Sequence, residues 1–476
     1  MRSYAARYKE ISSSIVCSTK FGRYPKISLE QVWNLIESDG WMVNFAGYDQ
    51  VVEINPVGQG RGIYSSVKFN HLIAVIDDNV YVFDESLNKR LVGNMTTFTG
   101  DVFISENNIN QIAISDLQNI YVYNYGNETF IKANINFTPG YITFQNGRFI
   151  SPDTSSNQWR LSQTNDGSIW PGTISDTQYI GALQTKPDFA MATIRFPGRG
   201  NLLYVMGKTV TEPWYDIGAQ LFPYQRSPSV NVDYGCLNSA TIAYGDNIIC
   251  WLAANESSGP VILYTNGGDI VPISTDGIDF KLAQLVQPEN AYAFMFKQDG
   301  HLLYVITWPT DNITYIYDFN TKKFFNISDP NFNHHIAKRI AFFNNKYYFV
   351  SFIDGNLYEL SSEILSANGM QIPRVIIPPT IRLPNQGRFV CGYTGFTIEE
   401  GMATNDGNPP IAQMAMAKDG NGNFGSYYTK VLNQVGQRQN RLIWWQLGSA
   451  NDLTFQYRFY GLSRFVATNG LTGIYQ

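Results

Sequence analysis

This chain of 476 residues has few charged residues and only four cysteines. Lys, Arg, Asp and Glu make up 15% of the sequence, against roughly 25% in a typical soluble domain. The net charge is −5 at pH 7, which argues against a dedicated nucleic-acid binder, because such proteins cluster Lys and Arg to neutralise phosphates. Cys17, Cys236, Cys250 and Cys391 lie far apart without any CxxC spacing, so no zinc site or thioredoxin-like motif is expected.

Long apolar runs are missing as well. No stretch of 18 apolar residues occurs, and the N-terminal sequence MRSYAARYKE has no apolar core. We therefore expect neither a membrane anchor nor a secretory signal. Together with the scattered cysteines, this predicts a protein that folds in a reducing compartment.

The motifs of common catalytic and metal sites are also absent. The sequence has no HExxH, no GxSxG, no GxxxxGK[ST] and no GxGxxG leading into a helix. His334 and His335 are adjacent, and neighbouring residues on a strand point to opposite faces, so they are not expected to share a metal. His71 and His301 lie beside strand residues and are interpreted as structural. The sequence predicts no catalytic residue, no metal and no cofactor.

Aromatic residues are abundant, with 30 Tyr and 30 Phe. The segment Gly300–Phe325 holds two alternating, aromatic-rich strands separated by a polar break and followed by a Lys-rich turn. Weaker copies of its second half occur at Asn79–Gly93, Asn119–Lys132 and Asn356–Leu365. A repeated strand–turn–strand unit predicts a propeller-like all-β array, in which each sheet buries its faces against its neighbours.

The units recur at roughly 40-residue intervals, which is the spacing of four-stranded propeller blades. We place them near 60–98, 100–138, 140–182, 190–233, 238–282, 290–328 and 335–365. The sequence thus predicts six or seven blades. Tyr304 and Tyr317 alternate on strands of one unit and are expected to be buried between adjacent sheets.

Composition divides the chain into three predicted parts. The first is an N-terminal arm with a short helix, residues 1–45, in which Ser28–Ser38 has an N-capping box and one apolar face. Strand–turn units then fill the propeller-like part, 46–369. Four prolines within Met370–Pro384 are typical of a linker or an edge segment, and a β-sandwich-like module is predicted for 370–476.

The N-terminal arm is locally basic, with Glu10 as the one acid of its first 26 residues. Such an arm is either simply solvated or a docking element for an acidic partner surface. The candidate docking residues are Arg2, Arg7, Lys9, Lys20, Arg23 and Lys26.

A carbohydrate-binding or glycan-processing propeller is the alternative interpretation. Glycosidases need two carboxylates about 5–9.5 Å apart, and the candidates are Glu399, Glu400, Asp279, Asp318 and Asp354. Asp318 and Asp354 fall at strand-to-turn junctions, where Asp bonds its own backbone, so we interpret both as turn residues.

Two segments support the β-rich interpretation without adding chemistry. Thr164–Trp170 and Ala417–Phe424 resemble partial Asp-box turns, in which an Asp ties down a hairpin tip above a buried aromatic ring. Such turns are folding devices. The glycan-binding interpretation rests on these partial Asp boxes and on the nine Trp residues, and substitution of Trp214 or Trp308 should then abolish glycan binding or hydrolysis.

A series of landmarks spans most of residues 40–460 in a fixed order. They are Phe45–Asp49, Gly58–Tyr64, Gly200–Gly218, Leu221–Arg226, Val232–Ala243, Val271–Asp279, Asp299–Thr310, Tyr315–Phe324 and Ala417–Arg458. Together they resemble the packaged-DNA stabilisation, or tail-hub, proteins of short-tailed phages. Ala46 departs from the Pro that is usual in this family, and Trp308 stands where Phe is favoured.

The resemblance implies a non-enzymatic structural protein of the virion tail, made in the cytoplasm of the host bacterium. Family members form a six-fold ring beneath the portal and its adaptor ring. They close or extend the DNA channel, retain the packaged genome and seat a tail needle or tailspikes. The expected partners are therefore further copies of the chain, the portal–adaptor ring, the distal tail proteins and phage DNA that passes without sequence-specific binding.

Overall fold

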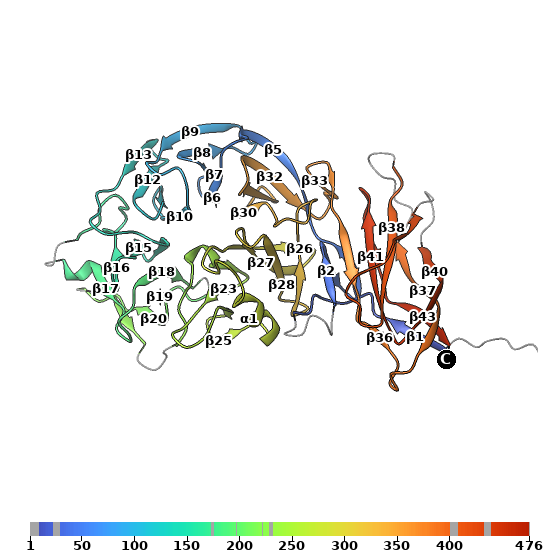
Figure 1. Ribbon diagram of the computed structural model, residues 1–476. Coiled ribbons are helices and arrows are strands. Elements are labelled where there is room, and N and C mark those ends of the chain that lie inside the picture. The colour runs from blue at the N-terminus through green and yellow to red at the C-terminus, as the bar shows by residue number, and fades with distance from the viewer. Residues whose placement is uncertain are drawn as a thin grey trace, which may run out of the picture.

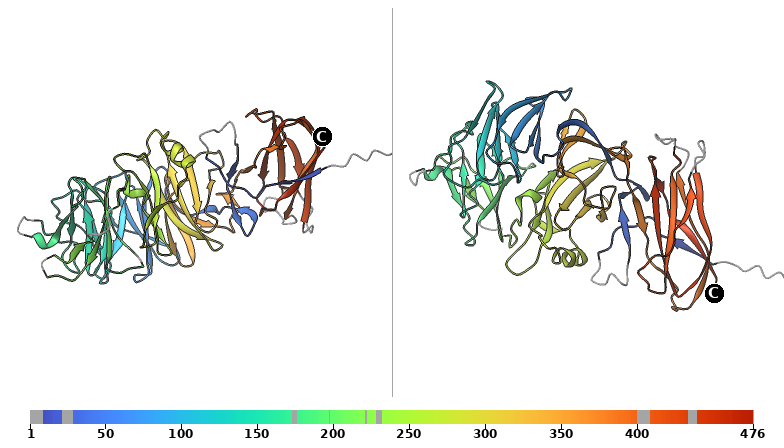
Figure 2. Two further views of the ribbon diagram at one scale, coloured as in Figure 1. Left: turned by 90° about the horizontal axis from the view of Figure 1, so that it is seen from below. Right: turned by 45° about the horizontal axis from the view of Figure 1, so that its top comes forward.

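The computed structural model of the chain is built almost entirely of β-strands (Figure 1). The structure describes residues 9–21, 29–172, 176–196, 198–220, 222–227, 232–399, 408–432 and 439–475. Within these ranges the only α-helix is α1 (Asp276–Leu282), and two 3-10 helices, η1 (Thr177–Tyr179) and η2 (Ser239–Thr241), accompany it. The strands form a ring of blades and, beside it, a second all-β part that carries the C-terminus (Figure 2).

Six blades are consecutive four-stranded antiparallel meanders. The first three consist of β6 (Gly60–Ser66), β7 (His71–Ile76), β8 (Asn79–Phe83) and β9 (Lys89–Asn94); β10 (Phe103–Glu106), β11 (Gln111–Ser115), β12 (Ile120–Asn124) and β13 (Thr129–Lys132); and β14 (Thr143–Gln145), β15 (Arg148–Pro152), β16 (Gln158–Leu161) and β17 (Ile180–Ala182). The next three consist of β18 (Ala190–Arg195), β19 (Leu202–Gly207), β20 (Thr211–Asp216) and β21 (Tyr224–Arg226); β22 (Ala243–Gly245), β23 (Ile248–Ala253), β24 (Val261–Thr265) and β25 (Ile270–Pro272); and β26 (Tyr292–Gln298), β27 (His301–Trp308), β28 (Ile313–Asp318) and β29 (Lys323–Asn326).

A composite blade closes the ring. Its strands are β30 (Ala337–Phe343), β31 (Lys346–Ser351), β32 (Gly355–Ser361) and β5 (Gly47–Asn55). The strand β5 precedes the first blade in the chain but pairs antiparallel with β32, where Val52 lies opposite Leu357. The inner strand β30 then contacts β6 of the first blade. The six contiguous blades and this composite blade confirm the predicted all-β propeller.

Short turns of Asp, Asn and Gly connect the blade strands. Asp299 and Gly300 join β26 to β27 with positive φ angles of 50° and 87°, and Asn146 and Gly147 join β14 to β15 with 49° and 83°. Two consecutive residues with positive φ match the right-handed twist of the flanking strands. These turns explain why the repeated strand–turn pattern of the sequence predicts the blades well.

The helix predicted at Ser28–Ser38 is wrong. The described part of this segment holds two strands, β2 (Gln31–Trp33) and β3 (Leu35–Ser38), separated by Asn34 with a φ of 59°. Three apolar side chains that would have formed one helix face, Val32, Leu35 and Ile36, are all buried. Pairing with distant strands has overridden the local helical periodicity.

The strand β2 joins the propeller to the second all-β part. It runs parallel to β29 of the sixth blade, with Trp33 opposite Asn326. On its other side it pairs antiparallel with β35 (Arg374–Ile377). One continuous sheet therefore extends from the propeller axis into the C-terminal part.

The C-terminal part consists of two facing sheets. One contains β35, β36 (Ile381–Arg382), β38 (Ile411–Lys418), β39 (Tyr428–Val431) and β41 (Asp452–Tyr460). The other contains β37 (Phe389–Glu399), β40 (Gln439–Ala450), β42 (Val466–Ala467), β43 (Gly470–Tyr475), β3 and two further N-terminal strands, β1 (Lys9–Ser13) and β4 (Trp41–Asn44). Their side chains meet between the sheets, where the ring centroids of Phe396 and Tyr457 are 5.0 Å apart.

The N-terminal segment is distributed over both parts of the molecule. The strand β1 pairs with β43 at the edge of the C-terminal sheet, where Lys9 lies opposite Ile474. The short hairpin β33 (Ser366–Ala367) and β34 (Met370–Gln371) continues the composite blade through β5. The divisions placed at 45/46 and 369/370 stay predictions.

Apolar side chains fill the spaces between successive blades. Tyr304 is fully buried and Tyr317 is 7% exposed, which confirms the burial expected of both. They belong to a cluster that includes Cys250, Leu252 and Ile262 of the preceding blade. All four cysteines are free and buried, as expected of residues that act as small hydrophobic side chains.

Candidate functional site

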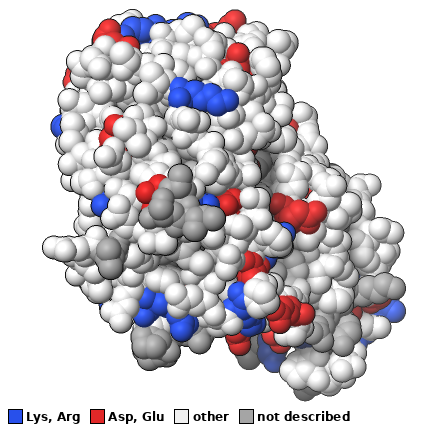
Figure 3. Space-filling view, turned by 90° about the vertical axis from the view of Figure 1, so that its left-hand side faces the viewer, with Lys and Arg blue, Asp and Glu red and all other residues white. Residues whose placement is uncertain are grey.

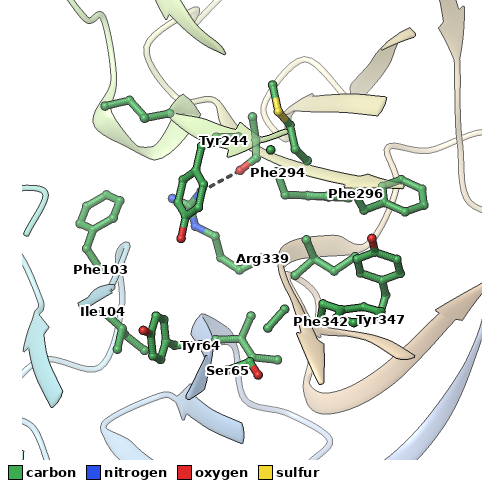
Figure 4. Close-up of a pocket in the computed structure, with 18 of the residues that line it drawn as sticks. Tyr64, Ser65, Phe103, Ile104, Tyr244, Phe294, Phe296, Arg339, Phe342 and Tyr347 are labelled. Carbon is green, nitrogen blue, oxygen red and sulfur yellow. Dashed lines mark hydrogen bonds between the residues drawn. The ribbon is translucent and has the colours of Figure 1, made fainter. Parts of the chain in front are cut away.

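The inner strands surround a hollow at the propeller axis, which we call the axial well (Figure 4). Its walls come mainly from β6, β10, β22, β26 and β30, and its volume is about 420 Å³. The aromatic side chains that line it include Tyr64, Phe103, Tyr244, Phe296 and Tyr347. Its volume lies in the range of small-molecule pockets, roughly 300–1,000 Å³.

Arg339 of β30 connects several blades at the wall of the axial well, and we call it the brace. Its Nη1 donates to the carbonyl oxygens of Ala240 and Ala293, at 2.6 and 2.8 Å. Its Nη2 lies 3.7 Å from the carboxylate of Asp101, and its guanidinium carbon lies 5.5 Å from the ring centroid of Phe103. One side chain thereby links three different blades.

Two further cations lie beside this brace. The ammonium of Lys338 is 3.5 Å from Asp101, and burial lowers the pKa of this lysine. Arg61 is fully buried and donates to the carbonyl oxygens of Gly100 and Thr97. Burial likewise lowers the pKa of Arg61, although three nearby carboxylates oppose this effect. Each of the three cations donates at least one hydrogen bond to a protein oxygen, so we interpret the cluster as structural, although Nε and Nη2 of Arg339 have no hydrogen-bond partner among the described residues.

The axial well does not admit double-stranded DNA. The major groove of a duplex is alone about 12 Å wide, and a sphere of that diameter has a volume of about 900 Å³, about twice the 420 Å³ of the well. Any passage for DNA has to lie outside the propeller axis of one chain.

The structure confirms the turn role predicted for two of the candidate carboxylates. Asp318 is fully buried and accepts hydrogen bonds from the amide of Asn320 at 2.9 Å and the hydroxyl of Thr321 at 2.8 Å. Asp354 accepts from the amide of Asn356 at 3.0 Å and from the hydroxyl of Tyr358 at 2.7 Å. Asp318 fixes the turn that follows β28, and Asp354 fixes the turn between β31 and β32.

The other candidate carboxylates lie on separate elements. Asp279 is in α1, where burial raises its pKa. Glu399 ends β37 in the C-terminal part, and Glu400 lies outside the described residues. Nothing in the described structure joins these groups into a glycosidase pair.

The two indoles expected of a glycan-binding propeller are buried. Trp214 is 3% exposed and donates to the carboxylate of Glu212, and Trp308 is fully buried and donates to the carbonyl of Pro288. Neither presents a face to a sugar, so these two Trp residues do not support a glycan-binding site.

The first partial Asp-box works as a folding device. Asp166 accepts hydrogen bonds from both the amide and the hydroxyl of Ser168. Trp170 is 6% exposed and donates to the carbonyl of Gly167. In the second, Asp419 accepts from the amide of Asn451 at 2.7 Å.

Among the described residues, no group of three or more His, Cys, Asp or Glu side chains is arranged to hold a metal. His71 stacks on Phe69 with ring centroids 3.9 Å apart. His335 is buried, and desolvation together with the neighbouring His334 lowers its pKa to about 3. His335 is therefore neutral in the folded protein over the physiological pH range.

This buried histidine makes stability depend on pH. Above pH 6.5, the ordinary pKa of histidine, we expect His335 to have little effect on the free energy of unfolding. Below pH 6.5 the free energy of unfolding should decrease. The reason is that His335 of the unfolded chain becomes protonated, whereas in the folded protein it stays neutral down to about pH 3. The expected loss is about 2 kcal/mol between pH 7 and pH 5. Denaturant unfolding at a series of pH values measures it. The variant His335→Gln should lose this part of the slope, and equal slopes in the two proteins would contradict the assignment.

The basic arm is only partly described. Lys9 is exposed on the edge strand β1. Lys20 forms an ion pair of 3.0 Å with the buried carboxylate of Glu30. The remaining docking candidates, Arg2, Arg7, Arg23 and Lys26, lie outside the described residues. The docking role of the arm stays a prediction. No helix among the described residues is long and apolar enough to cross a membrane.

The sequence did not lead us to predict that Arg339 connects several blades. The signal for this role was the pair Lys338–Arg339 within an otherwise apolar strand pattern. Two adjacent charges on a strand that is covered on both faces indicate buried, paired cations.

Comparison with known proteins places the propeller in a family. Residues 23–365 match the phage stabilisation family, whose model is described as bacteriophage P22 Gp10, beta-propeller. No curated protein matches the chain.

Solved propellers share the fold only. A streptogramin B lyase has 13% sequence identity and a TM-score of 0.44, covering 68% of this chain and 99% of its own. A catalytically inactive virginiamycin B lyase from Staphylococcus aureus with quinupristin has 12% identity and a TM-score of 0.45, covering 66% and 99%. The N-terminal domain of Nup159 has 10% identity and a TM-score of 0.42, covering 70% and 99%.

Proposed function

The chain belongs to the phage stabilisation family of P22 Gp10-like β-propellers, and from this premise we propose that it is a structural, non-enzymatic component of the phage tail. In this role several copies, most simply six, form a ring below the portal and its adaptor ring. The ring closes or extends the DNA channel, retains the packaged genome and seats the needle or tailspikes. The family match over residues 23–365 is the observation that carries the proposal.

The dimensions of the propeller favour a ring of several chains. The axial well is too small for a duplex, so a DNA passage has to be enclosed between copies of the protein. A closed ring requires each subunit to present two different, complementary surfaces to its neighbours. The two parts of this chain, joined through β2, provide an elongated body with separate surfaces at its two ends (Figure 2).

The surface composition is compatible with large polar contacts. The side of the propeller farthest from the C-terminal part carries small, separated groups of charges on a mostly uncharged surface (Figure 3). Interface cores are depleted of charge and enriched in Tyr, Phe and Trp, and this chain has 15% charged and 14% aromatic residues. A net charge of −5 also suits the wall of a channel through which DNA slides without binding.

The basic arm is the element that we assign to attachment. Six cations against one acid in the first 26 residues fit an acidic surface on the adaptor ring through electrostatic complementarity. Neutralising the six cations to glutamine should weaken attachment to the adaptor without preventing the ring from closing on itself. Localisation in the virion tail, after synthesis in the host cytoplasm, follows from this placement.

Reconstitution tests the proposal. Purified protein is mixed with the portal–adaptor assembly and imaged by electron microscopy. We expect closed rings that cap the channel, with six-fold symmetry in class averages. Free monomers beside uncapped portals, at protein concentrations well above micromolar, would contradict it.

A further inference from the structure

Three polar side chains form a linear hydrogen-bonded chain where the β3–β4 hairpin meets the sixth blade. The hydroxyl of Ser38 lies 3.1 Å from Nε2 of His301, and Nδ1 of His301 lies 2.9 Å from the carboxylate of Asp318. We propose that these residues form a nucleophile–base–carboxylate triad, which gives this protein the capacity for acyl transfer. This activity would be additional to the structural role proposed above and departs from its non-enzymatic character; the structural role does not depend on it.

The hydrogen bonds determine which atom carries which proton. The carboxylate of Asp318 can only accept from His301, so Nδ1 of the ring is the protonated nitrogen. In the neutral imidazole, Nε2 is then an acceptor, and the Ser38 hydroxyl donates its proton to it. This is the arrangement in which a histidine serves as general base for a serine.

The two supporting residues are held firmly. His301 begins β27 and is 7% exposed, and Asp318 ends β28 and is fully buried. The bonds from Asn320 and Thr321 to Asp318 fix its carboxylate at a turn. Asp318 is thus a positioning residue that orients the ring of His301 toward Ser38.

Ser38 is accessible, unlike its two partners. It is partly exposed at the end of β3 and lines a hollow of about 410 Å³ whose other lining residues come mainly from β4, β37 and β42 of the same sheet. Trp41, Val43 and Val466 give the hollow an apolar surface, and the charged residues Arg464, Asp39 and Glu399 also line it. The apolar side chains suit the ester of a short apolar acyl group, and the acidic residues favour an ester without a further carboxylate.

The hairpin supplies a donor for the developing oxyanion. Asp39 and Gly40 form its tip with φ angles of 49° and 82°. No described residue accepts a hydrogen bond from the amide of Asp39 or Gly40. The amide that directly follows a nucleophilic serine is a common oxyanion donor, and the amide of Asp39 has this position relative to Ser38.

The proposed reaction has two balanced steps. Oγ of Ser38 attacks the ester carbonyl while its proton passes to Nε2 of His301. The carbon–oxygen bond to the leaving alcohol breaks, and the alcohol takes that proton. Water then attacks the acyl–Ser38 ester, gives a proton to Nε2, and Ser38 leaves with it as the free hydroxyl. No oxidant, metal or cofactor is needed.

Active-site labelling tests the triad. The full-length protein is treated with a fluorophosphonate probe, the modified peptide is identified by mass spectrometry, and hydrolysis of p-nitrophenyl acetate and butyrate is followed. We expect one labelled residue, Ser38, and hydrolysis that falls by roughly 100-fold or more in Ser38→Ala. Asp318→Asn should lower kcat with little change in KM, because it affects the ring of His301 and not the hollow.

A second serine provides the matched control. The hydroxyl of Ser362 donates to the carboxylate of Asp299 at 3.1 Å without a histidine between them, so Ser362→Ala should leave labelling and hydrolysis unchanged. Thermal unfolding verifies that Ser38→Ala is folded, and particles that carry it should retain DNA like the wild type. Labelling of the wild type no faster than of Ser38→Ala, or at another serine, would overturn the triad and leave a purely structural contact.

Discussion

Replacing Tyr304 by alanine is expected to destabilise the propeller by about 3–5 kcal/mol. The ring of Tyr304 is fully buried between the fifth and sixth blades, so its removal leaves a cavity that close-packed sheets fill only in part. Its hydroxyl also donates to the carbonyl of Thr241 at 2.9 Å, and this carbonyl would lose its partner. Denaturant unfolding of the purified variant measures the loss.

Two further variants separate packing from hydrogen bonding. Tyr304→Phe keeps the ring and should cost about 1–3 kcal/mol, the range for a buried acceptor left without a partner. Tyr428→Ala removes a tyrosine that is 53% exposed and should change stability by less than about 0.5 kcal/mol. A cost below about 1 kcal/mol for Tyr304→Ala would show that blades five and six do not pack as described.

Replacing Arg339 by methionine is expected to cost about 3–5 kcal/mol. Methionine keeps most of the aliphatic volume but donates no hydrogen bond, so the carbonyls of Ala240 and Ala293 lose their donor. Asp101 would keep Lys338 as its one ion-pair partner among the described residues. Because Arg339 links three blades, we also expect a lower unfolding cooperativity, seen as a smaller m-value.

A double variant isolates the charge interaction. In a double-mutant cycle with Asp101→Asn, the loss of stability in the double variant should be smaller than the sum of the two single losses, because Arg339 and Asp101 interact directly. The exposed Arg388 forms hydrogen bonds only to the hydroxyl of Ser449 in the described structure, and Arg388→Met serves as the matched control with little effect. If Arg339→Met is as stable as the wild type, Arg339 is not a brace.

The blades were predictable because their determinants are local. Alternating aromatic strands and turns such as Asp299–Gly300 fix each hairpin within a few residues. The closure of the ring was not predictable, since β5 finds β32 at the far end of the propeller sequence. The helix prediction for the segment around Val32 and Leu35 failed because of distant partners as well. The apolar spacing of this segment fits a helix, but β2 pairs with β29 and β35, which are far away in the sequence.

The functional residues were harder to predict than the fold. Asp318 was correctly predicted as a turn residue, and its bonds to Asn320 and Thr321 account for this role. The hydrogen bonds that connect Asp318 through His301 to Ser38 depend on the contact between the β3–β4 hairpin and the sixth blade, which are far apart in the sequence. No sequence spacing encodes such a contact, so only the folded arrangement reveals it.

If this protein keeps packaged DNA inside the virion, particles assembled without it should differ from wild-type particles in the DNA that they retain. Particles purified from an infection in which the gene is disrupted are assayed for encapsidated DNA before and after incubation with nuclease. We predict that such particles fill normally and then lose their genome, and that added purified protein prevents the loss. Particles that retain a full, nuclease-resistant genome without this protein would contradict the account.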